Sequence, residues 1–299
     1  MTAEPISARI DTLQRRLGAV LFARVAGPQG PANRARFAAD GPRWFADGRP
    51  IRRVHGDAAM FVGGLRALLL QSLHPQAMTA VAQHSDYRTD PWGRLQRTST
   101  FLAATTFGPA DDAQAAVDHV RRVHAHVTGT GPDGLPYRAD DPHLLRWVHV
   151  AEADSFLRCH QRYGAQPLDA AGCDGYVADA ARIAAALGVT DPPRSTAELD
   201  LALREYQPEL RAIPEAREAA RFLVWNPPLP LLARGPYALL AATAVAELPA
   251  WARRELRLPL PRLAGSVLVP PVGHGVVGAV RWMMASRGQP ASAAESRGK

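Results

Sequence analysis

The sequence predicts an all-α fold, arranged as a single multi-helix globular domain. Segments of helical length carry apolar residues at a 3.6-residue period and are separated by proline, glycine and capping residues. No segment alternates polar and apolar residues between hairpin turns, and no strand-and-helix alternation appears. Of the 299 residues, 47% are apolar and 21% are charged, which is typical of a folded globular chain. A multi-helix body without a regular sheet is therefore expected.

The N-terminal third predicts three helices. Residues 5–24 form an amphipathic pattern, and residues 27–48 read as a connection rich in proline, glycine and arginine. Asp57 can cap a long apolar helix that ends at His74, because the residue before Pro75 is pushed out of the helical region. Gly63 and Gly64 in that helix permit close approach of another helix or of a flat ligand. A further helix is expected to end near Ala82.

The remaining helices follow from similar signals. Pro91 suits the first turn of a helix that Gly108 and Pro109 end, and two aspartates open the next helix, which carries His124. Residues 129–142 form turns. Helices are expected over 143–164, 174–188, 195–206, 214–225, 234–247 and 249–257. The domain is predicted to span residues 1–287, with a disordered tail over 288–299.

The composition limits the classes of partner and the cellular location that are expected. The formal charge is +7, but the arginines are scattered and no basic stripe is interleaved with aromatic residues, so nucleic acid is not an expected partner. Cys159 and Cys173 lack the spacing of a zinc or redox motif, which fits a reducing compartment. The N-terminus lacks the apolar core of a signal peptide, and no later run has membrane-spanning length. A cytoplasmic protein without stable membrane insertion is expected, and its oligomeric state is left open.

Several enzyme classes lack their motifs here. The chain has no phosphate-binding glycine loop followed by lysine, no GxGxxG after a strand, no HExxH and no GxSxG. The paired Glu-x-x-His motifs of helical di-iron proteins are also missing. Histidine is the remaining candidate for chemistry.

Two groups of polar residues stand out on consecutive predicted helices. Arg94, Arg97, Thr98 and Phe101 share one helix face, and His124 shares a face of the next helix with Thr128. His124 and His126 are about 200° apart on a helix, so they cannot ligate one metal ion together. This pattern favours a single axial imidazole, which is what a haem iron needs from the protein.

The ordered motifs resemble one known family. The run LLLQSLHPQAMTAVAQHSDYRTDPWGRLQRTSTFLAATTFG is followed by VRRVHAHVTG, DPHLLRWVHVAEADSFL, LREYQPEL and ELPAWARREL. Together these resemble the catalytic domain shared by fungal MpaB oxygenases and latex-clearing rubber oxygenases, over about residues 45–260. The resemblance implies an all-α protein with haem b in a pocket between helices, which uses O2 to cleave a carbon–carbon double bond.

The resemblance also assigns roles to residues. It implies that His124 is the proximal ligand of the haem iron and that Arg94 and Thr98 hold the cofactor, including its propionates. Arg97 occupies the place of a lysine near the distal face and is the catalytic candidate. Thr128 replaces an arginine and is included among the cofactor-binding residues. The family's proposed glutamate base is absent near Met78.

The predicted function is that of a haem-dependent oxygenase acting with O2 on a hydrophobic small molecule, for example an isoprenoid or another natural product. One alternative is a non-catalytic helical protein of the same fold that binds haem or lipid. Another is a non-haem iron enzyme that uses His124 with His84 and Asp86. Simpler interpretations also remain: Arg94 could pair with Asp86 or Asp90, and the Thr98 hydroxyl could bond a backbone carbonyl.

Overall fold

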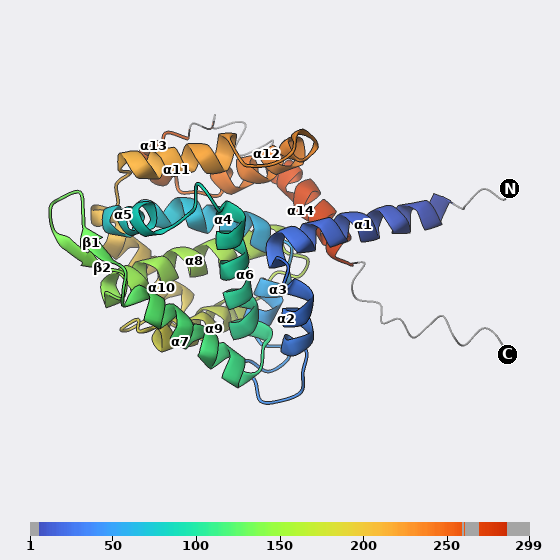
Figure 1. Cartoon of the computed structure of the whole chain (residues 1–299), viewed down its shortest axis with the longest axis horizontal. Helices are drawn as coiled ribbons and strands as arrows, with labels where there is room; N and C mark the ends of the chain where they lie inside the picture. The colour runs from blue at the N-terminus through green and yellow to red at the C-terminus, as the bar shows by residue number, and fades with distance from the viewer. Residues whose placement is uncertain (1–5, 259, 261–268, 286–299) are drawn as a thin grey trace.

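The protein is all-α, as predicted. The computed structural model describes residues 6–258, 260 and 269–285, and there it contains fourteen α-helices, one short 3₁₀ helix and a two-stranded ribbon (Figure 1). The first half comprises α1 (Ile6–Ala26), α2 (Gly30–Phe37), α3 (Pro50–Gly56), α4 (Met60–Gln71), α5 (Pro75–His84), α6 (Pro91–Phe107), α7 (Ala110–His124), β1 (Thr128–Thr130) and β2 (Pro136–Arg138). The second half comprises α8 (Pro142–Tyr163), α9 (Ala170–Leu187), α10 (Thr196–Tyr206), η1 (Gln207–Glu209), α11 (Pro214–Trp225), α12 (Leu231–Ala246), α13 (Ala250–Glu255) and α14 (Val269–Ala285).

Helices α4 and α8 form the centre of the molecule and pack closely along their length. Gly63 of α4 lies against Phe156 of α8, where an added Cβ would be 2.9 Å from the Phe156 ring. The close helix approach expected at this glycine is therefore present. Helix α8 is buried along most of its length, and Trp147, Val150 and Ala151 have no exposed surface.

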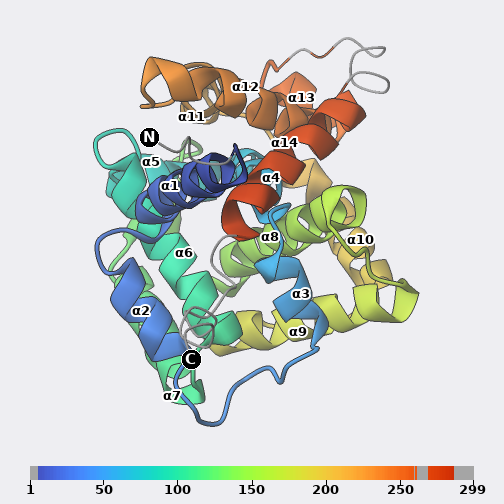
Figure 2. The ribbon, with the colours of Figure 1, turned by 90° about the vertical axis from the view of Figure 1, so that its right-hand side faces the viewer.

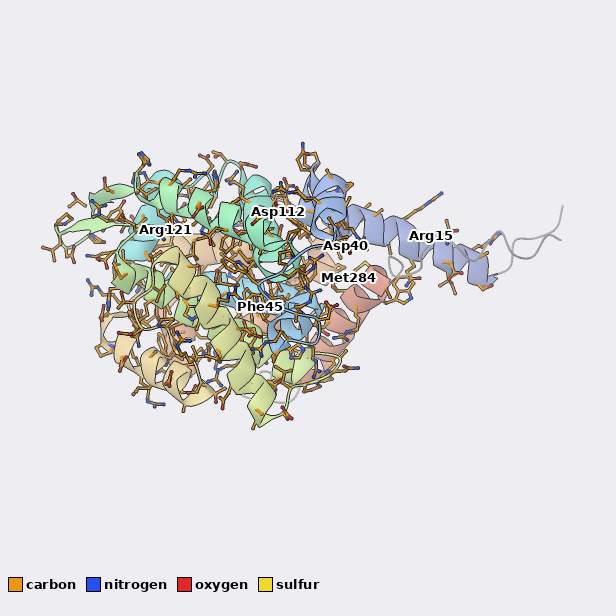
Figure 3. All side chains as sticks on the ribbon, turned by 90° about the horizontal axis from the view of Figure 1, so that it is seen from below. Arg15, Asp40, Phe45, Asp112, Arg121 and Met284 are labelled. Atoms are coloured by element: carbon orange, nitrogen blue, oxygen red, sulfur yellow. The ribbon has the colours of Figure 1, made fainter. Side chains whose placement is uncertain are left out.

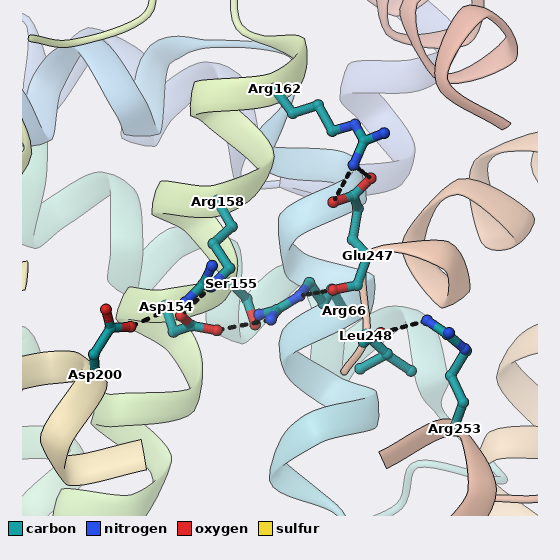
Figure 4. Close-up of polar contacts among 9 residues, drawn as sticks. All are labelled: Arg66, Asp154, Ser155, Arg158, Arg162, Asp200, Glu247, Leu248 and Arg253. Atoms are coloured by element: carbon teal, nitrogen blue, oxygen red, sulfur yellow. Dashed lines mark hydrogen bonds and ion pairs between the residues drawn. The ribbon is translucent and has the colours of Figure 1, made fainter. Parts of the chain in front are cut away.

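A buried polar network crosses this central pair (Figure 4). Arg66 of α4 is 2.7 Å from Asp154 of α8 and donates to the Ser155 hydroxyl at 2.6 Å and to the Glu247 carbonyl at 2.8 Å. Asp154 also accepts a hydrogen bond from Arg158, so both of its oxygens face a guanidinium. Through Arg158, which pairs with Asp200, the network extends to α10.

Helices α6 and α7 pack against each other, and α1 and α2 pack against α6 (Figure 2). Arg36 of α2 forms a two-bond ion pair with Asp112 near the start of α7. Asp112 and Arg121 mark two positions along α7 in the view from below (Figure 3). Thus α7, which carries His124, is tied to its surroundings at its N-terminal end.

Several short elements depart from the sequence-based expectations. Helix α2 lies in the stretch expected as a connection, and neither α3 nor α14 was predicted. Thr128–Thr130 pairs antiparallel with Pro136–Arg138 inside the predicted turn region, with Gly134 at φ +79° in the intervening loop. The tail predicted over 288–299 lies outside the described residues. No helix in the described ranges is both long enough and apolar enough to cross a membrane.

Candidate cofactor site

Arg94 sits in the second turn of α6, whose start is defined by Pro91 and by the Asp90 side chain, which accepts from the Gly93 amide at 2.9 Å. Its guanidinium donates to the Ser85 hydroxyl at 2.7 Å. Burial lowers the pKa of Arg94, and the nearby charge of Arg97 lowers it further. Among the described residues Arg94 has no carboxylate partner, so no opposite charge compensates its partly buried guanidinium.

Arg97 and Thr98 are both exposed to solvent. The Arg97 side chain is 62% exposed and lies 3.5 Å from Asp90, so the carboxylate considered for Arg94 pairs with Arg97 instead. The Thr98 hydroxyl donates to the Arg94 carbonyl at 3.1 Å, which is the backbone bond of a helix-face threonine. The three residues therefore share a helix face, as their spacing predicted, but only Arg94 is desolvated.

His124 is the last residue of α7 and is half-buried. Burial lowers the pKa of its imidazole, opposed by the charge of Asp140, so the ring is neutral at pH 7. Within the part of the chain that the structure describes, neither ring nitrogen forms a hydrogen bond. The imidazole thus offers a free lone pair.

A hollow of about 280 Å³ lies beside His124. It is lined by the end of α7, the loop residue Asp140 and the junction of α9 with Gly188. Small-molecule sites usually occupy about 300–1,000 Å³, so this hollow by itself would hold only part of a porphyrin.

Thr128 lies beyond α7, in β1. Its carbonyl accepts a hydrogen bond from His84 at 3.1 Å, and its residue is exposed. This bond joins the end of α5 to the ribbon that follows His124. Among the described residues, no hydrogen bond or ion pair joins His124 directly to Arg94, Arg97 or Thr98.

Three further polar residues lie deep among the helices. Burial lowers the pKa of His55 to about 3 and of His149 to about 4, and raises the pKa of Glu152 to about 6. The His149 Nε2 atom is buried without a hydrogen-bond partner. All three residues nevertheless keep some accessible surface. His149 and Glu152 are one helical turn apart on the mostly buried α8, a spacing by which the sequence could have marked them.

The donor chemistry of these residues fits a haem group. A neutral imidazole with a free nitrogen suits an axial ligand, and a desolvated arginine without a carboxylate suits a propionate. His149 offers a second buried imidazole nitrogen without a hydrogen-bond partner. The residues therefore supply the right donor types, but only His124 lines the hollow, and Arg94 and His149 do not.

The fold and this donor set define an all-α protein with a candidate cofactor site. Residues 52–282 match the family described as "ER-bound oxygenase mpaB/B'/Rubber oxygenase, catalytic domain". The chain belongs to this family, which confirms the resemblance of its motifs and makes it a member of an oxygenase group. No curated protein and no solved structure gives a significant match.

Proposed function

We propose that the protein is a haem b-dependent oxygenase that uses O2 on a hydrophobic small molecule, such as an isoprenoid, with oxidative cleavage of a carbon–carbon double bond as the favoured reaction. The observation that carries the proposal is the half-buried His124 imidazole, which is neutral and has no hydrogen-bond partner among the described residues. Membership in an oxygenase family supports the reaction class.

His124 would be the protein ligand of the iron. Its desolvation keeps the ring unprotonated at neutral pH, so the lone pair is available without loss of a proton. When bound, haem would supply an iron centre for reaction with O2.

Arg94 would bind a carboxylate of the cofactor. Its guanidinium is already fixed by Ser85, so little side-chain freedom is lost when a second partner binds. A carboxylate would also neutralise a charge that burial makes costly. Thr98 would act through Arg94, because its hydroxyl bonds the Arg94 carbonyl. Thr128 would help to position the segment after His124, because its carbonyl is held by His84.

Arg97 would be the catalytic cation, stabilising negative charge that develops during the reaction. To do so it must leave Asp90. That pair is exposed on both sides and is 3.5 Å long, and such pairs contribute at most about 1 kcal/mol. The side chain is therefore free to reorient at small cost.

The visible spectrum tests the cofactor. Protein produced with haem supplementation should show a Soret band, and His124→Ala should lose it. His119→Ala, which removes an exposed histidine from the same helix, should leave the band unchanged. If the wild-type chain shows no Soret band, the haem proposal fails. If the band survives in His124→Ala and disappears in His149→Ala, the axial ligand is His149 instead.

The exposed, paired position of Arg97 also favours a second candidate, a helical haem- or lipid-binding protein without turnover. Oxygen consumption with apolar alkenes separates the two. An oxygenase should consume O2 in proportion to the alkene oxidised, whereas a carrier should consume no more than free haem at the same concentration.

A further inference from the structure

Three potential metal ligands from distant parts of the chain meet away from His124. His74 caps the N-terminus of α5, His143 is the second residue of α8, and Glu209 ends η1. One ligand atom of each lies within 4.8 Å of the others. Glu209 Oε2 is 2.8 Å from His143 Nε2 and 3.6 Å from His74 Nε2.

His74 is the unusual member of the group. It is only 4% exposed, and neither of its ring nitrogens has a hydrogen-bond partner. The distance to Glu209 is too long for a hydrogen bond. A buried imidazole without partners has a desolvation cost that nothing in its immediate surroundings offsets. A bound ligand at Nε2 would offset it.

The surroundings of His143 orient its ring. The Tyr206 hydroxyl donates to the His143 carbonyl at 2.8 Å and lies 3.4 Å from His143 Nδ1. The contact of 2.8 Å between His143 Nε2 and Glu209 Oε2 is a hydrogen bond in which the ring N–H donates to the carboxylate. A metal ion bound here would take the place of that proton, because Nε2 and the carboxylate already face each other.

The backbone holds two of the three ligands in place. The Arg211 amide donates to the Leu73 carbonyl at 2.9 Å, which joins the residue before His74 to the segment just after Glu209. The group is therefore built on a fixed crossing of two segments, with α8 supplying the third ligand.

We propose that His74, His143 and Glu209 bind a divalent transition-metal ion, with Zn²⁺ the best fit. Two imidazoles and one carboxylate form a ligand set that proteins use for zinc, with a fourth position left to water. Ligand bonds of about 2.1 Å in a tetrahedron place neighbouring ligand atoms about 3.4 Å apart. The His74–Glu209 distance of 3.6 Å is close to that value, and the shorter His143–Glu209 distance has to lengthen toward it.

The site has solvent access on one side. The His143 and Glu209 side chains are 52% and 45% exposed, whereas His74 closes the site from within. The fourth ligand would therefore be water, and the metal would join α5, α8 and η1. Leu145, which borders the hollow beside His124, is two residues after His143 and so lies about 200° around α8. The metal site is thus distinct from the candidate haem site.

Calorimetric titration with Zn²⁺ alone tests the proposal. The full chain, first dialysed against a chelator, should bind one Zn²⁺ at this site and unfold at a higher temperature when Zn²⁺ is present. His143→Ala and Glu209→Gln should each weaken this binding at least about tenfold. Both residues are half-exposed, so these variants should fold. His74→Ala should also lose binding, but its buried position makes it the less informative variant.

Two matched variants control for general effects. Glu205→Gln removes an exposed acid from the neighbouring helix, and His119→Ala removes an exposed histidine from α7. Both should bind Zn²⁺ as the wild type does. The proposal is overturned if the wild-type chain binds no Zn²⁺, or if His143→Ala and Glu209→Gln bind it as tightly as the wild type. The Soret band of the wild type should be unchanged in His143→Ala and Glu209→Gln and in both control variants. The zinc test is therefore independent of the haem proposal.

Discussion

Arg66 and Asp154 form a 2.7 Å ion pair in which both side chains are almost fully buried, with exposures of 1% and 3%. The pair lies between α4 and α8, the two helices on which the rest of the molecule packs. Hydrogen bonds from Arg66 to Ser155 and to the Glu247 carbonyl satisfy two further donors of the guanidinium. Loss of Asp154 would leave the Arg66 charge buried without a carboxylate, and loss of Arg66 would leave the buried Asp154 with only the half-exposed Arg158 as its partner.

Arg66→Ala should therefore lower the free energy of unfolding by about 3–5 kcal/mol, the usual effect of breaking a buried pair. Arg88→Ala provides the control, because Arg88 pairs with Glu218 at 2.6 Å on the surface. It should cost no more than about 1 kcal/mol. Urea unfolding followed by circular dichroism measures both changes. Equal losses in the two variants would show that burial of the Arg66 pair has no special effect.

Adjacent glycines of α4 give a second matched comparison. A Cβ at Gly63 would lie 2.9 Å from Phe156 Cδ1 and 3.2 Å from the Phe156 Cα, whereas a Cβ at Gly64 would meet nothing closer than 3.9 Å. Gly63→Ala should lower the free energy of unfolding by about 1–3 kcal/mol through overpacking. Gly64→Ala should be neutral or should stabilise the helix by up to about 1 kcal/mol. A stable Gly63→Ala would mean that α4 and α8 can separate at small cost.

The sequence predicted the long helices because their signals are local. Pro91 and Asp90 define the start of α6, and the Ser195 hydroxyl caps α10 by accepting from the Glu198 amide, three residues on. The short helices α2 and α3 contain too few residues for a recognisable apolar period, and both lie in stretches dominated by proline and arginine. The ribbon is only three residues long on each strand, too short to show alternation.

The functional residues were less predictable because their surroundings are set by the tertiary fold. Spacing placed Arg94, Arg97 and Thr98 on one face, but it could not show that Arg94 is desolvated while Arg97 pairs with Asp90. His74, His143 and Glu209 come from three remote segments, and no sequence motif unites them. Their proximity depends on how η1 crosses the start of α5.

Stability should fall in mild acid because two buried histidines resist protonation. Burial lowers the pKa of His149 to about 4 and of His55 to about 3, from 6.5 in each case. As pH falls below 6.5, the unfolded chain takes up protons that the folded chain does not. Each histidine then costs about 1.4 kcal/mol per pH unit, until the pH reaches its folded-state pKa.

Glu152 has the opposite effect on stability, over a narrower pH range. Burial raises its pKa from 4.5 to about 6, so between these values the folded chain binds the proton more tightly. The contribution of Glu152 to the free energy of unfolding rises by up to about 2 kcal/mol as the pH falls from 6 to 4.5. At pH 5 the histidines dominate, with a combined loss of about 4 kcal/mol against a gain of about 1.4 kcal/mol.

Urea titrations at pH 7.5 and pH 5 can isolate one histidine. His149→Gln should reduce the loss between these pH values by about 2 kcal/mol, because the variant side chain does not titrate. His119→Gln, an exposed replacement on α7, should lose as much stability as the wild type. A wild-type chain that is equally stable at both pH values would contradict the burial of these imidazoles.

The contrast between Arg94 and Arg97 gives a final prediction for the proposed haem site. Arg94 is desolvated and lacks a carboxylate, whereas Arg97 is exposed and already paired with Asp90. Arg94→Gln should weaken haem binding by about 10- to 100-fold, because a hydrogen bond to a charged group contributes about 1.5–3 kcal/mol. Arg94→Lys should retain part of the affinity, since it keeps the charge but loses the planar two-donor geometry.

Arg97→Gln is the matched variant on the same helix. It should bind haem within about twofold of the wild type, because its partner is Asp90, but it should slow oxygen consumption if Arg97 stabilises charge in the reaction. Titration with haemin followed at the Soret band gives the affinities, and an oxygen electrode gives the rates. Equal loss of haem affinity in Arg94→Gln and Arg97→Gln would contradict the separate roles, because it would mean that both guanidiniums bind the cofactor or that neither does so directly.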